Sequence, residues 1–163
     1  MCVSILKGKQ FEYPIYFDLE EQKAFDTGKE NCSAMVHAFC EVLEKAGYWA
    51  GLYTSRSPLG THIEDDIKTR YALWIAEYGS KLNYSGSVGI WQHSCKGSVD
   101  GISGDVDLDT GYIDYAAKVK AAGLNGYSSE IAQPNPPVPV SDDGITVEVT
   151  VDGQKYSGKL NKA

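Results

Sequence analysis

Two carboxylates, Asp18 and Glu20, are the residues of this chain whose type and spacing point most directly to chemistry. They end the strand-like segment 13–20, which reads YPIYFDLE. Side chains two residues apart on a strand point to the same face, so the two acids share one face while Phe17 and Leu19 line the other. Paired acids at the carboxyl end of a strand are typical of a barrel strand that carries an active site. The alternative interpretation is a strand that runs out into a polar loop.

The segments that must position these acids alternate between strands and helices. A helix is expected over 30–46, where apolar residues recur with a 3.6-residue period and Gly47 supplies the stop. A second helix is expected after the next strand, with Leu59, Ile63 and Ile67 as its apolar stripe. This alternation favours a parallel sheet or a barrel. The further strands are expected over 49–54, 71–78, 88–93 and 105–108.

The C-terminal part of the chain has a different composition. Residues 128–143 are rich in Ser, Pro and Asp, which predicts a semi-extended linker. Residues 144–163 alternate apolar and polar positions on both sides of Asp152-Gly153, a pattern that predicts a β-hairpin. A lone hairpin is marginally stable in water, so it should pack on the main domain, pair with another copy, or be the stub of a further module.

Composition excludes several classes of function. The 163 residues are the size of one domain, since domains run to roughly 100–200 residues. A formal net charge of -7 argues against a nucleic-acid partner, because phosphate binding needs a basic surface. No apolar run approaches the ~20 residues that span a bilayer, so no membrane partner is expected. The first residues are too short for a secretory signal, so either the protein is not exported by that route or its natural N-terminus is missing.

The cysteines and histidines predict neither a metal site nor a cofactor. Cys2, Cys32, Cys40 and Cys95 lack the CxxC spacing of zinc and redox motifs. Cys32 and Cys40 should share a helix, where eight residues separate them by about 12 Å, too far for a disulfide. We therefore expect free thiols. The three histidines also lack ligand spacing.

Four segments occur in an order that is typical of one enzyme family. They are YPIYFDLE at 13–20, AGYWAGLYTS at 46–55, WIAEY at 74–78 and IWQHSCKGSVDGISGDVDLD at 90–109. With them, the chain resembles the C-terminal part of a glycoside hydrolase family 25 muramidase, also called a Chalaropsis-type lysozyme. The segment KAAGLNGY at 120–127 is similar to a tail of bacterial and prophage members. The resemblance covers 1–127 and implies an α/β fold, part of a TIM-like (β/α) barrel.

The resemblance also implies roles for three acids. Glu20 matches the general acid, which protonates the glycosidic oxygen between N-acetylmuramic acid and N-acetylglucosamine. That role requires a raised pKa, which burial or a nearby negative charge would provide. Asp18 matches the carboxylate that stabilises the oxocarbenium-like transition state or positions the acetamido group of the substrate. Asp107 matches a further acid at the end of the last barrel strand; from the residues alone, it could equally be a turn residue.

Four other residues match positions at the mouth of the family's barrel: Tyr53, Trp74, Tyr78 and Gln92. Aromatic faces stack on sugar rings, and an amide can bond to hydroxyl or N-acetyl groups. The alternative for these residues, and for Trp74 in particular, is packing in the core. The residues do not decide between a retaining and an inverting reaction, because carboxyl separations of about 5–5.5 Å and about 6.5–9.5 Å are both reachable from neighbouring strand positions.

The main departure from the family is an absence. The chain supplies about five strands where a full barrel has eight, and about 80 residues of a full barrel are not accounted for. The part not accounted for includes a first strand that bears an aspartate in family members. An unclosed sheet leaves two edges exposed. We therefore expect self-association through these edges or through the C-terminal hairpin, or a need for the remaining strands.

Three functional hypotheses follow. The first is a peptidoglycan hydrolase that acts on the glycan strands of the cell wall by acid catalysis. The second is a fragment that binds or assembles on wall glycan without cutting it, with the hairpin as the stub of a wall-binding or dimerisation module. The third is a truncation product without function.

Overall fold

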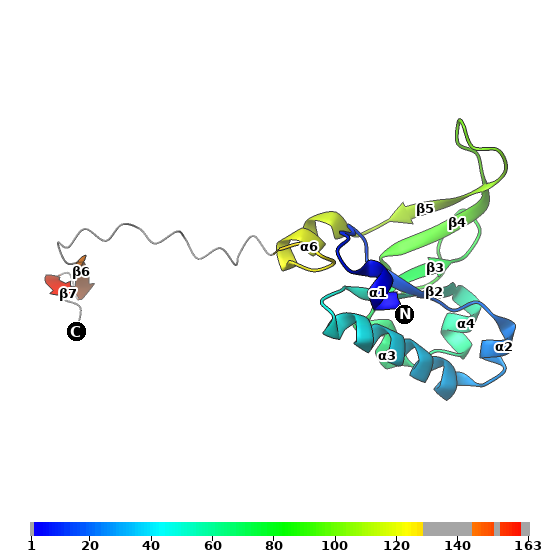
Figure 1. Cartoon of the computed structure of the whole chain (residues 1–163), viewed down its shortest axis with the longest axis horizontal. Coiled ribbons are helices and arrows are strands. Elements are labelled where there is room, and N and C mark those ends of the chain that lie inside the picture. The colour runs from blue at the N-terminus through cyan, green and yellow to red at the C-terminus, as the bar shows by residue number, and fades with distance from the viewer. Residues whose placement is uncertain (1, 129–144, 152–153, 161–163) are drawn as a thin grey trace. The chain divides into compact units, whose positions relative to one another are not determined.

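The computed structural model describes residues 2–128, 145–151 and 154–160 (Figure 1). The chain divides into two compact units, Met1–Glu130 and Ile131–Ala163. In the second unit, β6 (Ile145–Val151) pairs antiparallel with β7 (Gln154–Leu160), as the predicted hairpin requires. The predicted turn Asp152-Gly153, and the predicted linker beyond residue 128, lie outside the described residues.

The first unit is built on one mixed sheet with the strand order β1-β2-β3-β4-β5. Strands β1 to β4 are parallel to one another, and β5 is antiparallel to β4. The five-stranded α/β architecture is therefore confirmed, whereas a wholly parallel sheet is not observed. Parallel neighbours need a crossover of about a dozen residues or more, and the segment 98–105 between β4 and β5 is shorter than that. The strands are β1 (Ile15–Asp18), β2 (Ala50–Ser55), β3 (Ala72–Ala76), β4 (Ile90–Gly97) and β5 (Val106–Gly111).

The helices agree with prediction in part. Helix α3 (Lys29–Lys45) lies where it was expected, and Gly47 follows it with a φ of 82°. The second predicted helix is two helices, α4 (Arg56–Thr61) and α5 (Asp65–Arg70). The chain becomes extended at Glu64, whose N–H donates to the Ser33 hydroxyl, 3.0 Å away. The remaining helices are α1 (Cys2–Leu6), α2 (Gln22–Phe25) and α6 (Tyr115–Ala122).

The hydrophobic core lies between one face of the sheet and the helices that cover it. Figure 1 shows α3 and α4 on this side of the sheet. Leu52 and Ile75 of the strands pack with Val36 and Cys40 of α3, and all four are completely buried. The four cysteines are free, as predicted. No helix within the described residues is long and apolar enough to cross a membrane.

Because side chains alternate along a strand, the opposite face of the sheet carries a different set of residues. Tyr16 and Asp18 of β1, Tyr53 of β2 and Trp74 of β3 follow this alternation, whereas Phe17 of β1 packs against Phe39 of α3. The fold thus places the predicted site residues away from the helix-covered core.

Candidate active site

Strand pairing brings three predicted site residues into one row. Asp18 is opposite Tyr53, and Tyr53 is opposite Trp74 on the next strand. The carboxyl ends of parallel strands meet at one edge of a sheet, where α/β proteins place their sites. These three side chains therefore lie side by side near the edge at which a barrel would open.

Glu20 lies two residues beyond β1, so the predicted strand over 13–20 extends too far at its end. Its backbone is nevertheless held against β2. The Leu19 N–H donates to the Tyr53 carbonyl oxygen at 3.0 Å, and the Leu19 carbonyl oxygen accepts from Thr54 Oγ1 at 2.7 Å. The residue before Glu20 is thus anchored by two hydrogen bonds to the neighbouring strand.

The surroundings of Glu20 favour the protonated form of its carboxyl group over the carboxylate. Partial burial raises the pKa of Glu20, and the negative charges of Asp18, Glu21 and Asp107 raise it further, in that order. The structure thus brings together the three acids that the sequence singled out. A raised pKa extends the pH range in which a carboxylic acid can donate a proton.

Asp107 reaches this group from an unexpected direction. It is the second residue of β5, so it belongs to a strand and not to a turn, and it lies near the beginning of the last strand and not near its carboxyl end. Val106 pairs with Gly97 at the end of β4. Because β5 runs antiparallel, its beginning lies at the edge where the parallel strands end, and Asp107 comes close to the other two acids for that reason.

A buried amide joins two tyrosines of the site. Tyr53 and Tyr78 both donate through their hydroxyl groups to Gln92 Oε1, at 3.0 and 3.2 Å. Gln92 is only 3% exposed. Burial, with the charge of Glu20 next in size, raises the pKa of Tyr53 to about 12. Burial also raises the pKa of Tyr78, so both phenols remain hydrogen-bond donors near neutral pH.

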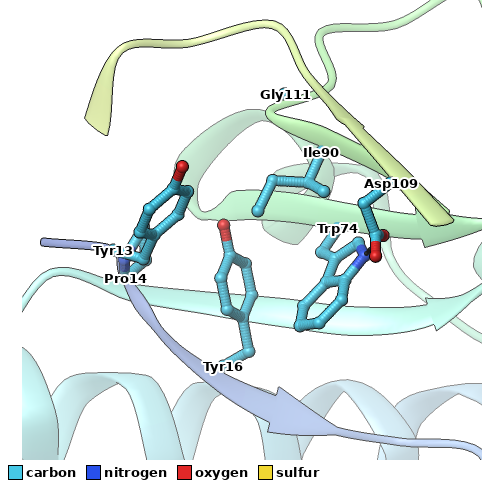
Figure 2. A pocket seen from close by; sticks show the side chains of 7 residues that line it. All are labelled: Tyr13, Pro14, Tyr16, Trp74, Ile90, Asp109 and Gly111. Atoms are coloured by element: carbon cyan, nitrogen blue, oxygen red, sulfur yellow. Dashed lines mark hydrogen bonds between the residues drawn. The ribbon is translucent and has the colours of Figure 1, made fainter. Parts of the chain in front are cut away.

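Trp74 contacts Tyr53 of this hydrogen-bonded group and also lines a cavity of about 410 Å³. Its ring contacts Tyr53 and Tyr16 edge-on, at centroid distances of 4.9 and 5.4 Å. Figure 2 shows Tyr16, Trp74 and Asp109 gathered around the cavity. Trp74 is therefore a wall of an open space and not a core residue. The cavity is lined by Tyr13, Pro14, Tyr16, Trp74, Ile90, Asp109 and Gly111.

Asp109 is a site residue whose role could not be predicted from the sequence. Its Oδ1 accepts a hydrogen bond from Trp74 Nε1 at 2.7 Å. Asp107 and Asp109 are two residues apart on β5, so they share a face of the sheet. That spacing was the available signal, although only the structure shows the contact with Trp74.

Comparison with known proteins identifies the family. The family model described as glycosyl hydrolases family 25 matches residues 2–102, more than half of the chain. The chain belongs to glycosyl hydrolase family 25. The matched residues include Asp18, Glu20 and the Tyr53–Gln92 pair, whereas Asp107 and Asp109 lie beyond them.

The relatives of this family 25 chain are cell-wall lytic proteins. It is 38% identical over 81 residues to the autolytic lysozyme of Clostridium acetobutylicum, a match that covers 49% of this chain and 25% of that lysozyme. The crystal structure of the CTP1L endolysin superposes with a TM-score of 0.59 and 26% identity, covering 73% of this chain and 42% of the endolysin. The modular autolysin LytC from Streptococcus pneumoniae has the same fold, with a TM-score of 0.58 and 24% identity, over 66% of this chain and 28% of LytC.

The family 25 chain therefore spans between a quarter and about two fifths of the length of these relatives. Their fold accounts for the architecture of its first unit, in which a five-stranded mixed sheet is covered by helices on one side. Within the described residues, no group of three or more His, Cys, Asp or Glu side chains is arranged to hold a metal ion.

Proposed function

We propose that this chain carries the acid-catalytic part of a muramidase that cleaves peptidoglycan. The bond would be the β-1,4 linkage between N-acetylmuramic acid and N-acetylglucosamine. The observation that carries the proposal is the grouping of Glu20 with other acids, since burial and the charges of Asp18, Glu21 and Asp107 all raise the pKa of its carboxyl group. The family supports it as well, and LytC has been solved in complex with a synthetic peptidoglycan ligand.

In the proposed reaction, protonated Glu20 donates its proton to the glycosidic oxygen as the bond from that oxygen to the sugar breaks. The proton stays on the leaving hydroxyl group, and Glu20 becomes a carboxylate. Asp18 and Asp107 assist in two ways: their negative charges keep the proton on Glu20 before the reaction, and they favour the positive charge that develops on the sugar ring. Water then adds to the sugar, and its proton restores Glu20.

Aromatic and hydroxyl groups would hold the glycan beside these acids. Trp74 offers a ring against which a sugar can pack, and Tyr53 and Tyr78 offer hydroxyl groups. Gln92 is buried and already accepts from both tyrosines. Its proposed role is to keep the two phenols in place, so that the amide acts on the glycan through them.

The second candidate is glycan binding without cleavage. Two observations support it. The chain spans a quarter of the length of the autolytic lysozyme, and β1 pairs with β2 alone within the described residues. A site that needs a further strand for catalysis could still bind wall glycan through its aromatic residues.

A turbidity assay on purified cell walls separates the two candidates. We expect lysis by the unsubstituted chain, a loss of about 100-fold or more in Glu20→Gln, and no change in Glu30→Gln, a matched substitution on the exposed surface of α3. Wall binding without lysis, equal in all three proteins, would favour the binding fragment. If the unsubstituted chain shows no lysis and no binding, both candidates are rejected.

A further inference from the structure

The bond between Trp74 and Asp109 joins two strands that are not neighbours. Trp74 lies on β3 and Asp109 on β5, with β4 between them. Trp74 pairs with Ile90, and Ile90 pairs with Gly111. Trp74, Ile90 and Gly111 thus form one row across three strands. Asp109 lies two residues before Gly111, so the indole reaches it diagonally across β4. The N–O distance of 2.7 Å is typical of a charge-assisted hydrogen bond.

Ring packing alone does not determine the orientation of the Trp74 indole. Tyr53 and Tyr16 meet Trp74 at interplanar angles of 62° and 71°, and they restrict how far the ring can tilt. Neither contact specifies where the indole nitrogen points. Gly111, opposite Ile90, lines the same cavity, and a methyl group added there would meet no atom within 4 Å. Within this part of the site, Asp109 is thus the group that fixes the nitrogen edge of the ring (Figure 2).

An acid at position 109 has an electrostatic cost. Burial and the charge of Asp107 both raise the pKa of Asp109, which means that the carboxylate form is disfavoured there. The hydrogen bond from Trp74 and the charge of His93 act in the opposite direction. Asp109 adds a second negative charge beside Asp107 in spite of this cost. We take this as a sign that the hydrogen bond between Asp109 and Trp74 has a function.

We propose that Asp109 is a positioning residue of the glycan site, which holds the Trp74 indole as the wall against which a sugar ring of the wall polymer packs. The inference rests on the proposed function, because it assumes that the site accepts peptidoglycan. Asp109 acts through Trp74 and takes no part in proton transfer.

The test uses the whole chain with ¹⁵N-labelled tryptophan and a soluble tetrasaccharide of alternating N-acetylglucosamine and N-acetylmuramic acid. Nuclear magnetic resonance follows the indole N–H signals and the affinity together. Asp109→Leu should shift the Trp74 signal and weaken tetrasaccharide binding about tenfold or more, as the loss of a hydrogen bond to a charged group would. Asp109→Asn, whose amide oxygen still accepts, should restore affinity to within about threefold.

Two controls are built into the chain. Trp91 donates to the main-chain oxygen of Glu77 at 2.8 Å, so its signal should stay unchanged in each variant and reports an intact fold. Asp105 lies two residues on the other side of Asp107 and pairs with Lys96 at the surface. Asp105→Leu removes the same charge near Asp107 and should alter neither the Trp74 signal nor the affinity.

Each contrary result has a distinct meaning. An unchanged Trp74 signal in Asp109→Leu would overturn the positioning role. A shifted signal with full affinity would overturn the link between that role and the glycan. Absence of tetrasaccharide binding by the unsubstituted chain would overturn the proposed function and the glycan assignment, and the Trp74 signal would then decide whether Asp109 fixes the ring.

Discussion

The side-chain hydroxyl of Thr54 donates a hydrogen bond to the main-chain carbonyl oxygen of Leu19, across an Oγ1–O distance of 2.7 Å. Thr54 is 1% exposed and Leu19 is 3% exposed, so neither group is solvated. Leu19 directly precedes Glu20, which lies beyond the last residue of β1. This buried hydrogen bond therefore holds the backbone next to Glu20, the residue on which the proposed reaction depends, against β2.

Replacing Thr54 by Val should misplace Glu20 while keeping the shape of the side chain. The Leu19 carbonyl oxygen would lose its partner in a buried environment, which costs about 1–3 kcal/mol. We expect a lower free energy of unfolding in urea and a larger fall in wall lysis than in wall binding. Thr54→Ser retains the hydroxyl group and is the matched control. Equal lysis by the Val and Ser variants would show that the bond does not position Glu20.

The pH dependence of lysis should report the protonation of Glu20. A general acid is active when protonated, so the rate should fall as the pH rises through the raised pKa of Glu20. Asp107→Asn removes one of the negative charges that raise this pKa, and the alkaline limb of the profile should move to lower pH. Asp105→Asn, at an exposed position paired with Lys96, should leave the limb in place. A limb that moved equally in both variants would contradict the coupling of Asp107 to Glu20.

Gln92 should influence glycan affinity through the tyrosines that it holds. Gln92→Leu leaves the hydroxyl groups of Tyr53 and Tyr78 without their shared acceptor, whereas Gln92→Glu keeps an oxygen in that place. We expect the Leu variant to raise KM for cell walls about tenfold, with a smaller change in kcat. The Glu variant should lie between it and the unsubstituted chain. If kcat alone fell, Gln92 would have a different role from the one proposed.

Local patterns predicted much of this fold because they reflect burial directly. The two-residue alternation of β1 and the 3.6-residue period of α3 gave the correct faces, since each buries its apolar side against the other. The break between α4 and α5 was missed because it depends on Ser33, a residue of another helix. The direction of β5 was missed for a similar reason: acid and apolar residues alternate in the same way in parallel and antiparallel strands.

In the candidate site, too, local spacing could be used for prediction, whereas contacts between distant segments could not. Asp18 and Glu20 could be paired from spacing within one segment. Asp109 could not be connected to Trp74, because their contact depends on the register of three strands and on the diagonal reach of an indole across the middle one. The role of Gln92 as a shared acceptor also required the structure, since its partners lie on or just beyond two other strands.

Gly89 should contribute to stability because Tyr115 occupies the space that a side chain at position 89 would take. A Cβ at this position would lie 1.8 Å from Tyr115 Oη and 2.7 Å from Tyr115 Cζ. Tyr115 is 1% exposed, and its ring packs edge-on against Trp49. Gly89→Ala should therefore lower the free energy of unfolding by about 1–3 kcal/mol, the usual cost of overpacking. Thermal or urea unfolding measures this change.

The control for this prediction is Gly111→Ala, because a methyl group there meets no atom within 4 Å. Tyr115→Phe provides a second test. It removes the hydroxyl oxygen, which is the atom nearest to the added Cβ, and leaves the ring carbon behind. The double variant should recover part of the stability lost in Gly89→Ala. Full stability of the single Ala variant would mean that Tyr115 leaves this position at little cost.

The open sheet of the first unit should make the chain associate with itself. Within the described residues, β1 and β5 are the outer strands and each pairs with a single neighbour. An outer strand presents unpaired N–H and C=O groups to any second strand that reaches it. Tyr13, Tyr112 and Leu108, which lie on or next to these two strands, are exposed apolar side chains. We expect the mass measured by sedimentation to rise with protein concentration.

A chain shortened to residues 1–130, the first compact unit, separates the two sources of association. If the sheet edges are responsible, the shortened chain should associate as strongly as the whole chain. If it is monomeric while the whole chain associates, the contacts come from the second unit, where β6 and β7 pair with each other. A compact monomer at all concentrations, for both proteins, would show that the edges of the five-stranded sheet are protected by the chain itself.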